Sequence, residues 1–494
     1  MITGKPQMHP AWMVTVPLLF AWPSPRPAIA QMPAAREAQT AARDARLRVT
    51  PVRVAPGFPV HVVITGLPPG AAATVHAQSV VTDDSGHLQP YYADATFLGN
   101  RGRTVSLDTA APVTGYYRGA DPRGLFWSAR PTARDSAART ANAALHLGAG
   151  DHLTPGQVRL TLTVQGFIRD RAIVTFARAD SGLLRQDVHT GGFVGAFYFE
   201  RGARRRPVVL VLGGSEGGLD VADWIGPKLV ARGFAVLGVE YVSPRGAPVR
   251  GVAATVNRIP IELLDSARAW LSNRPEVAID RLGVVGYSKG AEFALVLASI
   301  DSWIKAVVAY APSDFVWQGI RTGESGTASS SWTRRGRELS FIPTKGTREA
   351  IVRGRRDGTP IYLARVVRSS LAAASPAELH AARIPVEHSH AALLLIGGGD
   401  DQLWDSGASV MRLAARLRQA RYAYPLQTLV YTGAGHVLVG TGWQPTTTDN
   451  TDQFRNGGSA RNDAYAQGDS WPRVLAFLSL RLGQSGRLGD QPMR

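Results

Sequence analysis

The chain has 494 residues, enough for two or three domains that each bury a core of their own. Hydrophobic residues make up 45% and charged residues 19%, which is typical of a globular chain and not of a disordered one. The formal net charge is +17, but the basic residues are nearly all scattered Arg without a groove-reading motif, so we expect no nucleic-acid partner. Cysteine is absent, which excludes disulfides, Cys metal sites and a Cys nucleophile.

The N-terminal segment has the three parts of a secretory signal peptide. Lys5 precedes the short apolar run "AWMVTVPLLFAW" (11–22), and the small residues Ala28 and Ala30 follow it in an A-x-A pattern. The run is too short to form a stable bilayer span. We therefore predict a signal peptide at 1–30 and an exported protein, periplasmic or secreted, with no stable membrane span after cleavage. The alternative is a membrane anchor formed by an uncleaved signal.

The next part of the chain has the pattern of an all-β domain. Residues 31–46 are polar and Ala-rich and are predicted to be a linker. From 47 to 180, short apolar or alternating segments are separated by Pro, Gly, Asp and Asn, as in "LRVTPVRV", "PVHVVITGL", "ATVHAQSVV", "ATFLGN" and "VRLTLTVQ". This pattern predicts an immunoglobulin-like β-sandwich.

From 181 to 482 the pattern changes to continuous apolar strands that alternate with helices. The strands include "RPVVLVLGG", "FAVLGVEY", "LGVVGYS", "IKAVVAYAP", "AALLLIGGGDD" and "LQTLVYTGAGH". Such strands are typical of a parallel-dominated sheet covered by helices on both faces. A polar, Arg- and Ser-rich stretch at about 316–383 is predicted to be an insertion that lies over the strand ends as a cap, and 483–494 a C-terminal tail.

A candidate nucleophile lies in "VVGYSKGAEFALVLAS" (284–299). Ser288 is the centre of a G-x-S-x-G motif, with an apolar strand before it and an apolar helix after it. A sharp turn there needs small neighbours, which Gly286 and Gly290 supply. Ser288 is therefore predicted to project its hydroxyl above the sheet.

A serine hydroxyl needs a base to take its proton and a third group to orient that base. α/β-Hydrolases supply them in the chain order Ser, Asp or Glu, His. "GGGDDQLW" places Asp400 and Asp401 directly after a buried strand, and "YTGAGH" places His436 after the next one. We predict His436 as the base and favour Asp401 as the acid. Asp400 is the alternative, and the acid that does not orient His436 is expected to cap the following helix.

The anionic intermediate of such a reaction needs backbone N–H donors. We predict the amide of Lys289 as one donor and that of Ser215 or Gly214, in "LGGSEGGLD", as the other, with Ser215 slightly preferred. This loop lacks the Gly-Lys-Ser/Thr ending of a phosphate-binding P-loop. His388 and His390 form an H-x-H pair without a carboxylate cluster, so we predict no metal site, and the chemistry requires no organic cofactor.

Several segments together resemble the acyl-CoA thioesterase and bile acid-CoA:amino acid N-acyltransferase family, here as an exported, bacterial-type member. They are "GFPVHVVITGLPPGA", "APVTGYYRGADPRGLFWS", "GGSEGGLD", "RLGVVGYSKGAEFAL", "GGDDQLW", "YTGAGH" and "DSWPRVLAFL". The resemblance implies an N-terminal β-sandwich joined to an α/β-hydrolase domain, with nucleophile, acid and base at Ser288, Asp401 and His436. It also implies hydrolysis, since acyltransferase members use Cys as nucleophile and thioesterase members use Ser.

The predicted function is that of a serine hydrolase that cleaves acyl thioesters, with a small-molecule thioester or ester as its substrate. CoA esters are scarce outside the cytoplasm, so an exported carboxylesterase or peptide or amide hydrolase of the same fold is the alternative. A further alternative is a non-catalytic secreted binding protein. The motif "RGLFWS" (123–128) is expected to belong to the core of the sandwich and not to a substrate pocket, because aromatic residues are usually buried.

Overall fold

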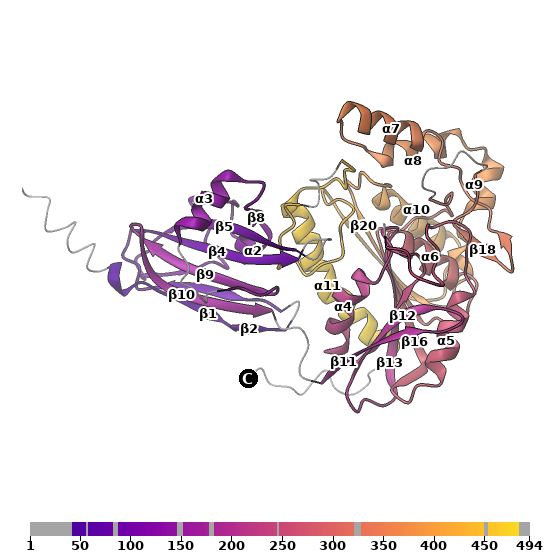
Figure 1. Ribbon diagram of the computed structural model, residues 1–494, viewed down its shortest axis with the longest axis horizontal. Helices are drawn as coiled ribbons and strands as arrows, with labels where there is room; N and C mark the ends of the chain where they lie inside the picture. The colour runs from indigo at the N-terminus through magenta and orange to yellow at the C-terminus, as the bar shows by residue number, and fades with distance from the viewer. Residues whose placement is uncertain are drawn as a thin grey trace, which may run out of the picture.

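The computed structural model shows an N-terminal β-domain beside a larger α/β-domain (Figure 1). The predicted signal peptide, residues 31–41 of the predicted linker and all of the predicted tail except Gly483 lie outside the described residues. Among the residues described, no helix combines the length and the hydropathy that a membrane crossing requires. The structure describes residues 42–483 apart from 56–57, 83–86, 146–151, 177–181, 245–246, 321–327 and 449–452.

The N-terminal domain consists of two sheets. The smaller sheet is antiparallel, with the order β1 (Arg46–Thr50), β3 (His61–Thr65), β6 (Thr104–Ser106). The larger sheet has the order β2 (Arg53–Val54), β10 (Phe167–Phe176), β9 (Gln157–Val164), β4 (Ala72–Thr82), β5 (Leu88–Leu98), β7 (Thr114–Gly115), with β8 (Arg130–Pro131) also on β5. Their apolar residues form one buried cluster, which confirms the predicted sandwich.

Two details of the sandwich differ from the sequence prediction. The segment "LRVTPVRV" is not one strand: it divides at Pro51 into β1 and β2, which belong to different sheets. Proline has no N–H to donate to a sheet, which explains the break at this residue. β5 begins at Leu88, well before the predicted "ATFLGN" segment, because β4 and β5 pair over their full length as a long hairpin.

The C-terminal domain is built on an eight-stranded sheet. Its first three strands in spatial order, β11, β12 and β14, pair antiparallel, and the others pair parallel, as predicted for a parallel-dominated sheet. The order is β11 (Leu183–His189), β12 (Val194–Glu200), β14 (Ala235–Glu240), β13 (Arg206–Leu212), β16 (Val277–Tyr287), β17 (Ala306–Tyr310), β20 (Ala392–Gly398), β21 (Leu426–Tyr431).

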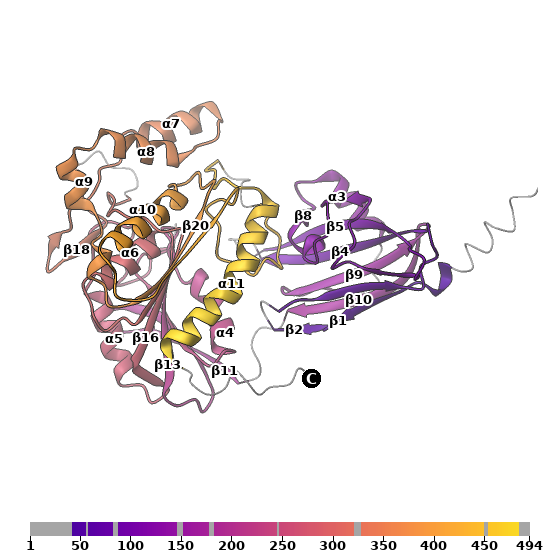
Figure 2. The ribbon, with the colours of Figure 1, turned by 180° about the vertical axis from the view of Figure 1, so that it is seen from behind.

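Helices cover both faces of this sheet, which explains why its strands are apolar without alternation. On β13, Val208 and Leu210 pack with α5 (Leu263–Ser272), α6 (Lys289–Ala298) and α10 (Ser406–Gln419). Val209, between them, faces the other side and packs with α4 (Asp220–Val230) and α11 (Ala460–Leu482). Figure 2 shows α11 lying across this second face.

The insertion contributes two short strands to a small sheet, whose third strand, β15, comes from the segment before α5, and it also contains three helices. The sheet is formed by β15 (Ile259–Pro260), β18 (Trp332–Arg334) and β19 (Arg337–Glu338), and the helices are α7 (Thr347–Asp357), α8 (Leu363–Ala373) and α9 (Pro376–Ala382), followed by the 3-10 turn η2 (Val386–His388). At the start of α8 the Ala364 N–H donates to the carbonyl of Gln402, 2.9 Å away, in the loop that follows β20. The insertion therefore lies at the carboxyl end of the sheet (Figure 1).

The two domains meet at "RGLFWS". Residues 124–128 of this motif are buried as expected, and the first four form the short helix α2 (Gly124–Trp127), but they pack against the C-terminal domain as well as the sandwich. Trp443, seven residues after His436, packs edge-on to Phe126 at 5.1 Å between ring centres, and the Thr446 N–H donates to the Trp127 carbonyl at 3.2 Å. The remaining helix of the sandwich, α3 (Ser136–Ala144), packs on β5.

Candidate active site

Ser288 lies in the sharp turn between β16 and α6. Its φ of 56° is in the left-handed region, which is unfavourable for a residue with a side chain and is kept only when the surroundings enforce it. A Cβ on Gly286 would lie 2.2 Å from the Gly290 carbonyl oxygen, and one on Gly290 would lie 2.3 Å from the Leu212 carbonyl oxygen. The two glycines therefore permit the close packing that this turn requires.

Ser288, His436 and Asp401 form a continuous chain of hydrogen bonds. The distance from Ser288 Oγ to His436 Nε2 is 2.9 Å, and that from His436 Nδ1 to Asp401 Oδ2 is 2.9 Å. The three side chains come from the ends of three parallel strands: β16, β20 and β21. They are only 5%, 2% and 2% exposed for Ser288, Asp401 and His436.

The surroundings of Asp401 determine the direction of these hydrogen bonds. Asp401 also accepts hydrogen bonds from the backbone N–H groups of Leu403, Trp404 and Ser406. Burial alone would raise the pKa of Asp401, but its interaction with His436 and its hydrogen bonds keep it below the ordinary value. Because the ionised carboxylate can only accept, Nδ1 of His436 donates to it and Nε2 is left to accept from the Ser288 hydroxyl.

The structure distinguishes the two adjacent acids by their partners. Asp400 accepts hydrogen bonds from the Gln402 side chain at 2.6 Å and from the Gly458 N–H at 3.1 Å. Asp401, not Asp400, contacts His436 and also accepts from the Ser406 N–H at the start of α10. The expectation that the second acid caps this helix is therefore wrong.

The predicted oxyanion donors lie on two adjacent segments. Lys289 is the first residue of α6, where a backbone N–H has no partner within the helix and the helix dipole favours an anion. The loop at Gly213 packs against Gly290 in the same turn. The Gly214 N–H donates to the Glu216 carboxylate at 2.9 Å, whereas no hydrogen bond of the Ser215 N–H is found within the described part of the chain. This difference favours Ser215 over Gly214 as the second predicted donor.

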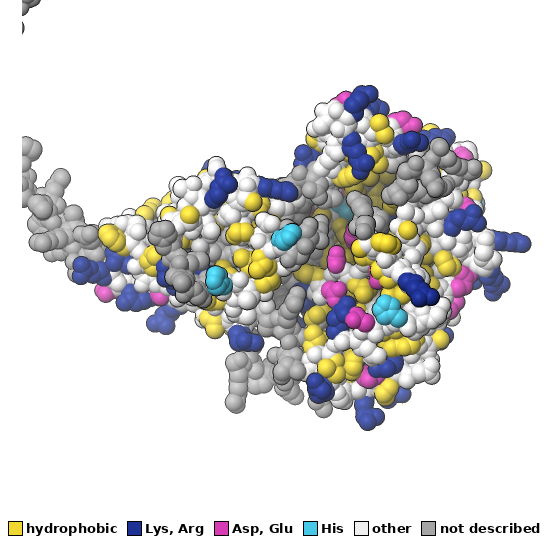
Figure 3. Space-filling model, viewed as in Figure 1, with side chains coloured by type: hydrophobic (Ala, Val, Ile, Leu, Met, Phe, Trp, Pro, Cys, Tyr) yellow, Lys and Arg dark blue, Asp and Glu magenta, His cyan; other side chains and the backbone are white. Residues whose placement is uncertain are grey.

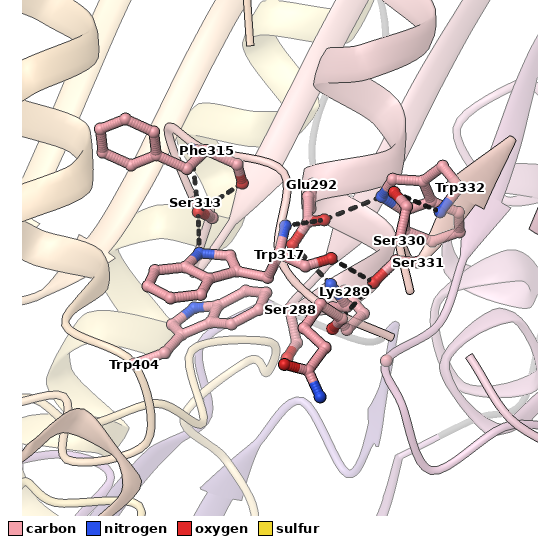
Figure 4. A network of polar contacts seen from close by, with 12 residues as sticks. Ser288, Lys289, Glu292, Ser313, Phe315, Trp317, Ser330, Ser331, Trp332 and Trp404 are labelled. Carbon is pink, nitrogen blue, oxygen red and sulfur yellow. Dashed lines mark hydrogen bonds and ion pairs between the residues drawn. The ribbon is translucent and has the colours of Figure 1, made fainter. Parts of the chain in front are cut away.

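From the sequence, Lys289 was predicted to act only through its backbone N–H, and no role was predicted for Glu292. Their side chains form a buried ion pair beside Ser288 (Figure 4). A signal was present: in "KGAEFALVLA" the only charged residues are three positions apart on a helix that is otherwise apolar and therefore buried. Trp404, whose ring lies 6.0 Å from that of His436, was also missed, and nothing in its sequence context marks it.

The H-x-H pair does not form part of this site. His388 ends η2, and the ring of His390 packs against Tyr424 with 5.6 Å between ring centres. Within the described ranges, no group of three or more His, Cys, Asp or Glu side chains could hold a metal ion.

The amino-acid sequence matches two family profiles. One is described as "BAAT / Acyl-CoA thioester hydrolase C terminal" and matches residues 259–484, and the other as "Acyl-CoA thioester hydrolase/BAAT N-terminal region" and matches residues 58–186. The chain is 24% identical over 458 residues to acyl-coenzyme A amino acid N-acyltransferase 1 of Mus musculus, covering 89% of this chain and 99% of the relative. It is 25% identical over 448 residues to acyl-coenzyme A thioesterase 1 of Homo sapiens, covering 88% and 96%.

A similar solved structure is that of a dienelactone hydrolase-like promiscuous phosphotriesterase, P91, from metagenomic libraries. It is 16% identical, has a TM-score of 0.37, and the match covers 61% of this chain and 100% of that chain. The relatives and the profiles cover both the sandwich and the α/β domain. The chain is a hydrolase, and it belongs to the family of acyl-CoA thioester hydrolases and bile acid-CoA:amino acid N-acyltransferases.

Proposed function

We propose that this protein hydrolyses acyl thioesters through an acyl-enzyme on Ser288, with His436 as the general base and Asp401 as the group that orients it. The observation that carries the proposal is the hydrogen-bond chain Ser288–His436–Asp401, with 2.9 Å at each of its two links. This chain links a hydroxyl, an imidazole and a buried carboxylate in the order that activates a serine. The relatives named as acyl-coenzyme A thioesterases support a thioester as the substrate.

In the first half of the reaction, Nε2 of His436 takes the hydroxyl proton as Ser288 Oγ attacks the acyl carbonyl carbon. The negative charge that develops on the carbonyl oxygen is stabilised by the N–H groups of Lys289 and Ser215. The carbon–sulfur bond then breaks, and the leaving thiolate takes the proton from Nε2.

In the second half, His436 removes a proton from water, which attacks the acyl-serine carbonyl. Collapse of this second tetrahedral intermediate returns the proton to Ser288 Oγ and releases the carboxylic acid. Asp401 holds His436 in the tautomer with Nδ1 protonated and stabilises the imidazolium that forms in each half. We assign water and not an amino acid as the acyl acceptor, because residue 288 is Ser and the chain has no Cys.

The test is steady-state hydrolysis of acyl-CoAs of several chain lengths beside p-nitrophenyl esters of the same acids, with Ser288→Ala as the blank. We expect kcat/KM for thioesters to exceed that for the matched esters. Turnover of esters alone would reassign the protein as a carboxylesterase that uses the same machinery. Turnover of neither substrate, together with no labelling of Ser288 by a fluorophosphonate, would overturn the proposal.

A further inference from the structure

Lys289 and Glu292 form an ion pair inside the protein. The two residues are 2% and 0% exposed, and Lys289 Nζ lies 2.8 Å from Glu292 Oε2 on the first turn of α6. Burying two charges is unfavourable unless other polar groups complete their hydrogen bonding. An apolar pair at these two positions, directly after the serine, would pack at a lower cost in free energy. The ion pair therefore indicates a role other than stability.

Glu292 joins the nucleophile helix to the base of the insertion (Figure 4). Its Oε1 accepts hydrogen bonds from the Trp332 indole N–H at 2.8 Å and from the Trp317 backbone N–H at 3.2 Å. The Trp332 ring also stacks on that of Phe293, with 4.4 Å between centres and 15° between planes. The two insertion segments are joined to each other by the Ser331 hydroxyl, which donates to the Trp317 carbonyl at 2.9 Å. One carboxylate thus fastens both segments to α6.

The Lys289 side chain lies near a residue that contacts both Asp401 and His436, namely Trp404. Its ammonium lies 5.5 Å from the ring centre of Trp332 and 5.7 Å from that of Trp404, within the range of cation–π attraction. Trp404 donates its backbone N–H to Asp401 at 3.2 Å, and its ring lies edge-on to that of His436. The ammonium therefore lies between the insertion and the loop that carries the predicted acid.

Each member of the pair depends on the other. Burial lowers the pKa of Lys289 and raises that of Glu292, and their mutual attraction opposes both shifts. Removal of one partner leaves a buried charge without its counter-ion, whereas removal of both charges leaves a neutral and sterically similar site.

We propose that the Lys289 and Glu292 side chains are positioning residues that hold the Lys289 peptide with its N–H directed at the oxyanion. The inference rests on the proposed function, in which this N–H stabilises the negative charge. The peptide follows the strained Ser288, so its orientation needs support from its surroundings. With the Lys289 side chain held by Glu292 and flanked by two indole rings, the first turn of α6 has little freedom to rotate.

The test is a double-mutant cycle of Lys289→Met, Glu292→Gln and the combined variant, because both substitutions remove a charge and keep the side-chain size. Gln at 292 also retains an oxygen that can accept from Trp317 and Trp332. Functional sites are counted by titration with a fluorophosphonate, and kcat is expressed per titrated site. We expect each single variant to lose about 10- to 100-fold in kcat with KM within about 3-fold of wild type, since a misdirected oxyanion donor affects the transition state and not substrate binding.

The combined variant is expected to be at least about 5-fold more active per site than Glu292→Gln alone, because it leaves no unpaired buried charge. Arg473→Met, which breaks the exposed Arg473–Asp469 pair on α11, is the matched control and should retain wild-type kcat.

Loss of titratable sites with unchanged kcat per site would overturn the inference, since it would show that the pair supports only folding. Losses that simply multiply in the combined variant would overturn it as well. Failure of the proposed function is distinguishable, because the wild-type protein itself would then show neither turnover nor labelling of Ser288.

Discussion

The carboxyl end of the C-terminal sheet and the interior of the N-terminal sandwich bury very different side chains. At the sheet end, the buried and ionisable residues include Lys289, Glu292, Asp401, His436 and Asp463. In the described part of the sandwich, Arg159 is the single charged side chain in the buried class. Burial of ionisable groups lowers the free energy of unfolding. Their concentration at one sheet edge is therefore typical of a functional site and not of a structural core. The sandwich has an apolar core, and Trp443 of the neighbouring domain packs into it.

The largest effect on activity is expected from removal of the proposed nucleophile, which should leave the fold intact. Ser288→Ala should lower kcat by about 10⁴-fold or more, because the remaining groups cannot form an acyl-enzyme. The melting temperature should not fall, since the serine lies in a strained turn and contributes one hydroxyl contact. Thioester turnover and thermal unfolding measured on the same preparation check both statements. Retained turnover in this variant would remove Ser288 from the mechanism.

The next largest effect is expected from the acid. Asp401→Asn keeps the size of the side chain but allows its NH₂ group to face His436, which favours the wrong imidazole tautomer, and kcat should fall by about 10³- to 10⁴-fold. Asp400→Asn is the matched control one residue away, because its side chain contacts Gln402 and Gly458 and not His436. Comparison of kcat for the two variants on one thioester measures the difference. Equal losses would show that the two acids share the role.

A third substitution tests whether the two regions depend on each other. Trp443 belongs to the C-terminal domain, is 8% exposed, and packs within the apolar cluster of the sandwich. Trp443→Ala should lower the free energy of unfolding by about 3–5 kcal/mol, as expected for loss of a buried aromatic side chain. Because the loop from His436 to Trp443 is short, we also expect a several-fold loss of kcat. Denaturant unfolding and turnover of the same variant check the two effects; unchanged stability would mean that the domains do not support each other here.

The smallest effect concerns pH and stability. Burial raises the pKa of the Asp463 carboxyl, which accepts a hydrogen bond from the Gly435 N–H, to about 7. This carboxyl holds its proton more tightly in the folded than in the unfolded chain, so its contribution to stability is present below about pH 4 and is lost as the pH rises through 7. Between pH 5 and 6, Asp463→Asn should gain about 1.4 kcal/mol relative to wild type, measured by denaturant unfolding. Stability curves that stay parallel over this range would contradict the assignment.

Much of the fold could be predicted from the sequence because its signals are local. Continuous apolar strands indicate a sheet buried on both faces, and the glycines around Ser288 indicate a sharp turn. The break at Pro51 was missed since apolar alternation continues across it. At the site, the spacing of strands brought Ser288, Asp401 and His436 into one prediction, whereas the partners of Lys289 and Glu292 lie in an insertion whose path depends on tertiary packing. The contact of Trp443 with the sandwich also has no local sequence signal, because it depends on the packing of one domain against the other.

The proposed function requires that Ser288 carries the acyl group. The most direct measurement is to incubate the wild-type protein with a fluorophosphonate, digest it, and locate the adduct by mass spectrometry while thioester turnover is followed. We expect one adduct, on the peptide that contains Ser288, and loss of turnover in proportion to its formation. An adduct on another residue, or full turnover with Ser288 blocked, would contradict it.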